Sequence, residues 1–104
     1  MLEAMPLENK SILMFVGDIY EDLELWYPKL RLIEAGAKVC VAGPAANVEY
    51  AGKNGYPCVS DAAIANVQAS DFDGLVVPGG FMPDTLRRDP QVLQLVRDFD
   101  AADK

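Results

Sequence analysis

Short apolar runs alternate with amphipathic stretches along this chain, which is the pattern of an α/β domain. Three runs, 11–16, 38–42 and 73–78, are largely apolar and are predicted strands, because buried parallel strands have such sequences. Between the first two runs, apolar residues recur at spacings of three and four, which predicts a helix over 21–35. A strand, a helix and a strand joined by short turns make a βαβ unit. We therefore expect the first two strands to be parallel, with a right-handed crossover.

The helix predicted over 21–35 contains a proline and is followed by a glycine. Pro28 removes a backbone donor, so we expect a local bend near Glu24, whose carbonyl loses its partner. Gly36 suits the position just after a helix end. One apolar face of this helix consists of Leu23, Trp26, Tyr27, Leu30 and Ile33.

Residues 48–59 are predicted to form a small hairpin outside the core strand pairs. The strand-like runs 48–51 and 56–59 flank Asn54-Gly55, and Asn-Gly between such runs is a strong hairpin signal. Pro57 confines its run to a sheet edge or a strand end.

The remaining stretches predict helices. Residues 61–65 are expected to make one or two helical turns capped by Ser60 or Asp61. Residues 83–86 predict a short helix. A longer helix is expected from Asp89-Pro90 to about Ala102, because Asp is a good cap and Pro fits the first helical position. Its apolar face consists of Val92, Leu95, Val96 and Phe99.

The three predicted strands and their helical crossovers make a doubly wound layer. Its expected spatial order is second strand, first strand, third strand, and ligands bind such layers outside the carboxyl ends of the strands at the switch point. That point lies between the first and third strands. It brings Val16-Gly17-Asp18 next to Pro78-Gly79-Gly80.

The composition fits one small globular domain. The chain has 104 residues, is 51% apolar and carries a net charge of −7, which argues against nucleic acid as a partner. No apolar run reaches the roughly 18–20 residues of a membrane span. Residues 1–10 lack the apolar segment of a signal peptide, so the cytoplasm and reduced cysteines are the expectation.

The residue types limit the chemistry that the chain performs by itself. It has no histidine, so neither a Ser-His-Asp nor a Cys-His site can form within it. Its cysteines, Cys40 and Cys58, are distant in sequence and cannot close a four-ligand zinc site. We therefore expect no metal and no cofactor. The simplest interpretation of both cysteines is that of small buried apolar residues.

Two local sequences remain as candidate chemistry. Four carboxylates fall within 18–24, and a helix start explains most of them, but Glu24 already lies a turn inside the helix. Glu24 is either a surface acid or a partly desolvated carboxylate suited to acid–base work or to hydrogen-bonding a thiolate. Gly79-Gly80 is either a tight turn or a backbone that offers N–H groups to a developing oxyanion. A receiver-type acid cluster is disfavoured, because Gly-Gly follows the third strand where that site needs an acid.

Taken together, these segments resemble the DJ-1/PfpI family, most closely its PfpI-like intracellular protease and glyoxalase branch. The similarity extends over about 11–104. The motifs that carry it are Gly17-Asp18-x-x-Glu21-Asp22-x-Glu24-x-x-x-Pro28, then Ala35-Gly36-Ala37-Lys38-Val39, then Asp73-Gly74-Leu75-Val76-Val77-Pro78-Gly79-Gly80.

The resemblance implies an α/β, flavodoxin-like doubly wound sandwich with a cysteine on a nucleophile elbow. Members are described as cysteine peptidases, glutathione-independent glyoxalases, deglycases and stress proteins, which implies a small carbonyl or acyl substrate. Glu24 matches the glutamate that hydrogen-bonds and tunes the cysteine. Gly79 and Gly80 match the pair whose backbone helps to form the oxyanion hole. Asp18 and Glu21 match positions near the pocket or the dimer surface.

The sequence departs from the family pattern after its last helix. Members continue into a strand and a Cys-His pair, whereas this sequence stops at Lys104, and Cys40 and Cys58 lie on strand-like stretches away from any elbow. We expect residues 1–10 to be a leader and 11–104 the N-terminal part of a single domain that lacks the elbow. We further expect it to be inactive alone and not to be a self-sufficient folded monomer. It is expected to pair with a chain carrying the other half, to self-associate, or to be one piece of a cleaved or truncated protein. The alternative is a non-catalytic module that binds a metabolite or a partner.

Overall fold

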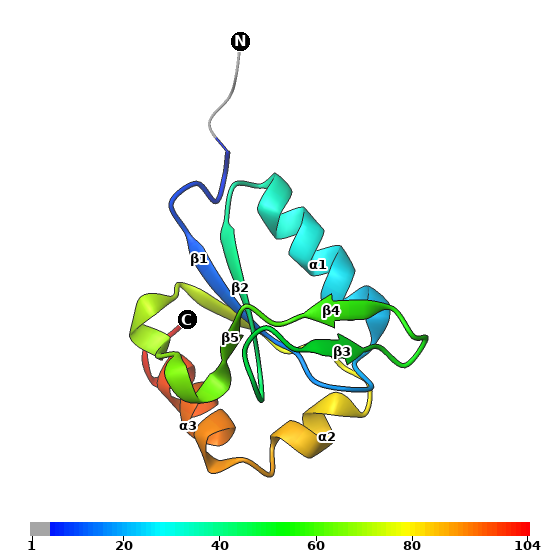
Figure 1. Cartoon of the computed structure of the whole chain (residues 1–104). Coiled ribbons are helices and arrows are strands. Elements are labelled where there is room, and N and C mark those ends of the chain that lie inside the picture. The colour runs from blue at the N-terminus through cyan, green and yellow to red at the C-terminus, as the bar shows by residue number, and fades with distance from the viewer. Residues whose placement is uncertain (1–4) are drawn as a thin grey trace.

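A computed structural model describes residues 5–104 and contains one central parallel sheet, a separate hairpin and three α-helices (Figure 1). The first four residues of the predicted leader lie outside the described residues. The elements in chain order are β1 (Ser11–Phe15), α1 (Asp22–Glu34), β2 (Lys38–Gly43), β3 (Glu49–Ala51), β4 (Pro57–Val59), β5 (Ala62–Ala63), two 3₁₀ turns η1 (Ile64–Asn66) and η2 (Ala69–Asp71), β6 (Gly74–Val76), α2 (Met82–Leu86) and α3 (Pro90–Ala101).

The sheet has the strand order β5-β2-β1-β6, and every pairing in it is parallel. The predicted order of second, first and third strand is therefore confirmed. Leu13 of β1 lies opposite Cys40 of β2 on one side and Leu75 of β6 on the other. The short β5 was not predicted: residues 61–65 form this strand and the start of η1 rather than a capped helix, and no side chain caps η1.

The α1 helix starts where the sequence predicts, but the face that it buries differs from the predicted apolar face. Glu21 is the N-cap, and its side chain accepts a hydrogen bond from the Leu23 N–H. Leu25 is fully buried, whereas Leu23 and Tyr27 are 74% and 70% exposed. The apolar spacing at 23, 27 and 30 thus marks a solvent-facing stripe in this chain, and the sheet is met mainly through Leu25.

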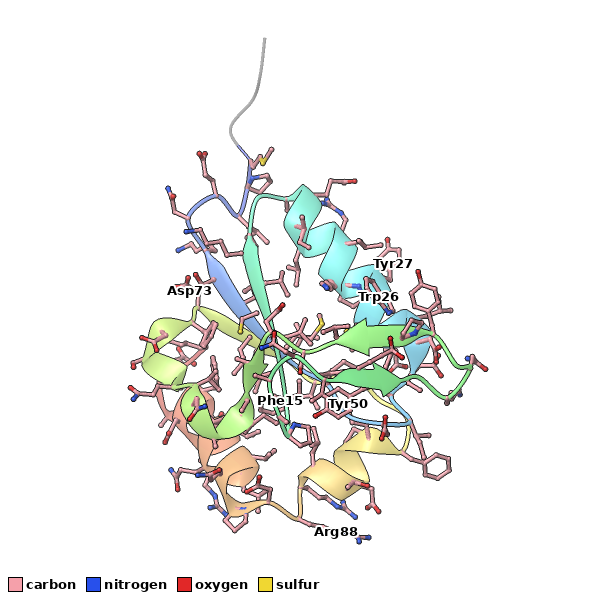
Figure 2. All side chains as sticks on the ribbon, viewed as in Figure 1. Phe15, Trp26, Tyr27, Tyr50, Asp73 and Arg88 are labelled. Carbon is pink, nitrogen blue, oxygen red and sulfur yellow. The ribbon has the colours of Figure 1, made fainter. Side chains whose placement is uncertain are left out.

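The core lies between the helices and the four-stranded sheet. α1 packs against β2 and α3 packs against β6, and the two helices lie on opposite sides of the central strands (Figure 1). Figure 2 shows Phe15 in the centre of the molecule, and Phe15 and Tyr50 of the hairpin belong to the same buried cluster. Fully buried side chains come chiefly from β1 and from the residues that follow it: Leu13, Met14, Phe15, Val16 and Tyr20.

The predicted hairpin is confirmed as an antiparallel pair, β3 with β4, outside the main sheet. Its turn lies beside the first turns of α1 (Figure 1). Because the hairpin contributes no strand to the main sheet, its turn is free to approach the carboxyl end of β1.

The C-terminal helix begins as predicted. Asp89 is the N-cap of α3, and its carboxylate accepts a hydrogen bond from Gln91 N–H at 2.9 Å, with Pro90 at the first helical position. On its predicted face Val92, Leu95 and Phe99 are buried, whereas Val96 is 41% exposed.

The first described residues do not extend freely from the domain. The Leu7 N–H donates to the Ala35 carbonyl at 2.9 Å, and Lys38 N–H donates to the Lys10 carbonyl. A Cβ on Gly36 would lie 2.7 Å from the Cβ of Met5, so residues 5–10 pack against the end of α1. The part of the leader that the structure describes is thus attached to the domain.

Replacing Leu25 by Ala should lower the free energy of unfolding by about 2–5 kcal/mol, because a fully buried leucine leaves a cavity. Leu23→Ala, on the same helix but largely exposed, is the matched control and should change it by less than about 0.5 kcal/mol. Urea unfolding followed by circular dichroism measures both values. Equal losses in the two variants would contradict the assigned helix face.

Candidate functional site

The carboxyl ends of β1 and β6 meet at a short connecting segment, residues 19–21, in which Ile19 has φ +62°. On one side the Ile19 N–H donates to the Ala51 carbonyl at 2.8 Å. On the other side the Glu21 N–H donates to the Gly79 carbonyl at 2.9 Å. Tyr20, between them, bridges to both Gly52 and Gly80. The segment therefore connects the hairpin to the glycine turn, and the two sequences that the topology predicted to meet do meet here.

Glu24 is bonded directly to the glycine turn. Its Oε1 accepts a hydrogen bond from the Gly79 N–H at 2.8 Å, across 55 positions of sequence. Its Oε2 has no hydrogen-bond partner among residues 5–104. The predicted partial desolvation of Glu24 is absent: the residue is exposed, because no described element covers this side of α1.

The two glycines of the turn have different environments. The Gly79 N–H is taken by Glu24, and a Cβ at Gly79 would overlap Glu24 Oε1. Gly80 has φ +93°, and a Cβ there would lie 2.6 Å from the Ile19 carbonyl oxygen, so both its conformation and its packing require glycine. The Gly80 N–H has no acceptor among the described residues. Of the predicted pair, Gly80 alone retains an N–H that can bind a ligand oxygen.

The predicted pocket residues Asp18 and Glu21 both contact the hairpin. Asp18 Oδ1 accepts a hydrogen bond from the Ala51 N–H at 3.1 Å. Glu21 Oε2 pairs with Lys53 Nζ at 2.7 Å, and this bond lowers the pKa of Glu21 and raises the pKa of Lys53. In this chain both acids therefore hold the hairpin to the start of α1.

Asp22 is a site residue that the sequence reasoning treated only as a helix-start acid. It is buried, and its two carboxylate oxygens accept the backbone N–H groups of Asn54 and Tyr56, each at 3.0 Å. The bond from Asn54 is the main cause of a lowered pKa for Asp22. The sequence signal that could have indicated this contact is the presence of both an acidic helix start and an Asn-Gly turn.

Both cysteines are free thiols away from this turn, as the sequence predicted. Cys58 is buried on β4 and Cys40 is half-buried on β2, and burial raises the pKa of each thiol, which disfavours the reactive thiolate. Residues 5–104 contain no cluster of three or more His, Cys, Asp or Glu side chains placed to bind a metal. Within the same residues, none of the helices has the length and apolarity that a membrane crossing requires.

Comparison with known proteins agrees with this architecture. The model of the DJ-1/PfpI family matches residues 10–104. The chain belongs to the DJ-1/PfpI family. The resemblance that the glutamate and Gly-Gly motifs suggested is thereby confirmed.

Relatives and solved structures of the family match most of the chain. The Bacillus subtilis protein named "Putative cysteine protease YraA" is 41% identical over 91 residues, which cover 88% of this chain and 54% of that protein. An uncharacterized protein of Staphylococcus haemolyticus is 40% identical over 80% of this chain and 48% of its own length. The structure of Drosophila melanogaster DJ-1beta superposes with a TM-score of 0.81 and 29% identity, covering 89% of this chain and 50% of that one. The chain thus spans about half the length of these proteins.

Gly79→Ala should displace the Glu24 side chain while leaving the fold intact, because the new Cβ would occupy the position of Glu24 Oε1. The carboxyl carbon resonance of Glu24 and the amide resonance of residue 79 report the loss of the bond. Gly74→Ala is the control, since its Cβ would meet only the end of Ile12 at 3.2 Å. An unchanged Glu24 resonance in Gly79→Ala would contradict the bond.

Proposed function

We propose that this chain supplies the carboxylate and oxyanion-binding side of a cysteine-dependent DJ-1/PfpI enzyme that acts on small reactive carbonyls or acyl bonds. The observation that carries the proposal is the hydrogen bond from Gly79 N–H to Glu24 Oε1 at the carboxyl ends of β1 and β6. This bond leaves Glu24 Oε2 on α1 and the Gly80 N–H on the adjoining glycine turn free for a thiol and a substrate oxygen.

The two free groups divide the chemistry between them. Glu24 Oε2 orients a cysteine thiol supplied from outside residues 5–104 and accepts its proton, and the resulting thiolate is the nucleophile. When its sulfur bonds to the substrate carbonyl carbon, the electron pair of the C=O bond moves onto oxygen. The Gly80 N–H then stabilises that oxyanion. Glyoxalase or deglycase chemistry fits as well as peptide hydrolysis, because short loops border the turn.

The thiol comes from a second chain or from the C-terminal half of a family domain, and the sheet has a place for it. Among the described residues β6 pairs only with β1, so its other edge offers unpaired backbone groups. Val77, just after β6, is 46% exposed. We propose that the occupant of this edge is the other half of a family domain, carrying the strand and the elbow cysteine. The assembly acts in the cytoplasm, where its thiol stays reduced. Self-association is the competing outcome.

A second candidate function is a non-catalytic module that binds a metabolite or a partner. It is supported by the sequence, which has no histidine, and by the positions of Cys40 and Cys58 on strands away from Gly80. The two candidates differ in one requirement: only the enzyme needs Glu24 to act on a thiol.

The Glu24 role is testable in a chimera in which residues 11–104 replace the matching part of YraA, which restores a full-length domain. Glu24→Gln should lower methylglyoxal turnover by about 10²-fold or more, because it removes the carboxylate that orients the thiol. Glu34→Gln is the control, since Glu34 lies at the far end of α1 and pairs only with Arg31 at the surface. If turnover in Glu24→Gln equals that of the parent chimera, Glu24 has no part in the mechanism.

The open β6 edge is testable on the chain itself. Co-expressed with the part of YraA that it does not match, the chain should co-purify with that part. Val77→Lys should weaken the complex about tenfold or more, because it places a charge beside the open edge. Val59→Lys on the hairpin, at a similar exposure of 53%, should have no effect. A chain that remains a two-state monomer in sedimentation and thermal unfolding, with or without that part, would refute the proposed partner.

A further inference from the structure

Asp22 makes contacts that its position at a helix start does not require. An acid in the first turn interacts favourably with the helix N-terminus while remaining in solvent. Asp22 is instead only 8% exposed, and both of its oxygens accept N–H groups from another part of the chain, Asn54 and Tyr56. Two charge-assisted hydrogen bonds to a buried carboxylate hold the hairpin turn at a defined position relative to α1.

The hairpin turn is shaped to receive this carboxylate. A Cβ on Gly52 would overlap the Asp22 carboxylate, so glycine is required for the close approach. Around this contact the Tyr20 hydroxyl donates to the Tyr56 carbonyl at 2.5 Å and accepts from the Trp26 indole N–H at 3.2 Å. The Trp26 ring meets the Tyr56 ring edge-on, at 5.3 Å between centroids. Trp26 lies between α1 and the hairpin (Figure 2).

Backbone hydrogen bonds connect the hairpin turn, through segment 19–21, to the candidate site. The Lys53 N–H donates to the Tyr20 carbonyl at 2.8 Å on the hairpin side. On the opposite side the Phe81 N–H donates to the Ile19 carbonyl at 3.0 Å. Segment 19–21 therefore lies between the hairpin on one side and the Gly79-Gly80 turn on the other, and it bridges to both. A shift of the turn moves the segment against which Gly80 packs.

We propose that Asp22 is a positioning residue that fixes the direction of the Gly80 N–H through the hairpin turn and segment 19–21. This inference rests on the proposed function for its catalytic meaning, but the physical coupling is a property of residues 5–104 alone. Asp22 itself lies two residues before Glu24 and does not bond to the Gly79-Gly80 turn.

The coupling is tested by NMR on the chain with Asp22→Asn. The amide side chain has one acceptor oxygen in place of two, so one of the Asn54 and Tyr56 N–H groups loses its partner. We expect that amide to exchange with solvent about tenfold faster. We also expect the Gly80 amide resonance to shift. Glu34→Gln, which removes the same charge from the same helix, should leave the Gly80 resonance unchanged.

Gly52→Ala perturbs the same contact from the hairpin side and should shift the same set of amides. If either variant shifts the amide resonances of Asn54 and Tyr56 while the Gly80 resonance stays as in the parent chain, Asp22 stabilises the hairpin turn alone and the proposal fails.

A titration of the parent chain gives a measurement that does not depend on any variant folding. The groups that face Asp22 are Lys53 and Tyr56 of the hairpin, Tyr20, and Glu21 of the same helix region. The pKa of Asp22 is lowered in the folded state. Its contribution to the free energy of unfolding is therefore present above the usual Asp pKa and is lost as pH falls through the lowered value. The Gly80 amide should titrate with the Asp22 carboxyl carbon. A Gly80 midpoint that follows Glu21, or no movement of Gly80, would overturn the proposal.

In the YraA chimera, Asp22→Asn should lower kcat and kcat/KM together by about tenfold with KM unchanged, because an oxyanion donor acts in the transition state. A rise in KM alone would contradict a role in positioning Gly80. If Glu24→Gln leaves turnover unchanged, the proposed function fails. The NMR experiments test the dependence of Gly80 on Asp22 separately, so a failure of the proposed function leaves that test intact.

Discussion

The parallel pairing of β1 with a neighbour on each side is the constraint from which the rest of the structure follows. β1 is bonded to β2 and β6 along the same residues, so its side chains are buried on both faces and its carboxyl end opens between two crossovers. The chain leaves β1 as segment 19–21, which is held by the hairpin and by the glycine turn. Glu21 lies on this segment, and Asp22 and Glu24 lie on the first turn of α1. Asp18 directly precedes the segment and bonds to the hairpin, and Gly79 and Gly80 form the glycine turn on its other side.

Backbone donors decide which polar groups are free for chemistry at this site. Glu24 Oε1 is occupied by the Gly79 N–H, and both Asp22 oxygens are occupied by the hairpin. These bonds fix the geometry, and they leave one carboxylate oxygen and the Gly80 N–H without partners among residues 5–104. A pre-positioned acceptor on α1 and a donor on the glycine turn bonded to it have the form of a site that stabilises developing charge. The exposure of Glu24 in this chain means that whatever completes the site must also supply its desolvation.

The sequence predicted the sheet order and the meeting of the two glycine-bearing turns, because both follow from strand–helix alternation and handedness. It predicted the hairpin from Asn54-Gly55 and the start of α3 from Asp89-Pro90. It failed where burial depends on partners far along the chain. The stripe through Leu23 and Tyr27 has helical spacing like a core face, yet it is exposed, since periodicity records which residues share a face and not what covers it.

The two acids Asp22 and Glu24 illustrate the same limit for the site. The sequence favoured Glu24 for chemistry because it was expected to lie a turn inside the helix, beyond the helix terminus. The structure corrects this premise, since α1 begins at Asp22 and both acids lie in its first turn. What separates their roles is the acceptor geometry of each, with two hairpin donors on Asp22 and one glycine donor on Glu24. Hydrogen bonds between residues 32 to 55 positions apart leave no local pattern in the sequence. A saturated carboxylate holds structure, and a carboxylate with one oxygen free can take part in a reaction, so the number of donors that reach each acid distinguishes the structural residue from the chemical one.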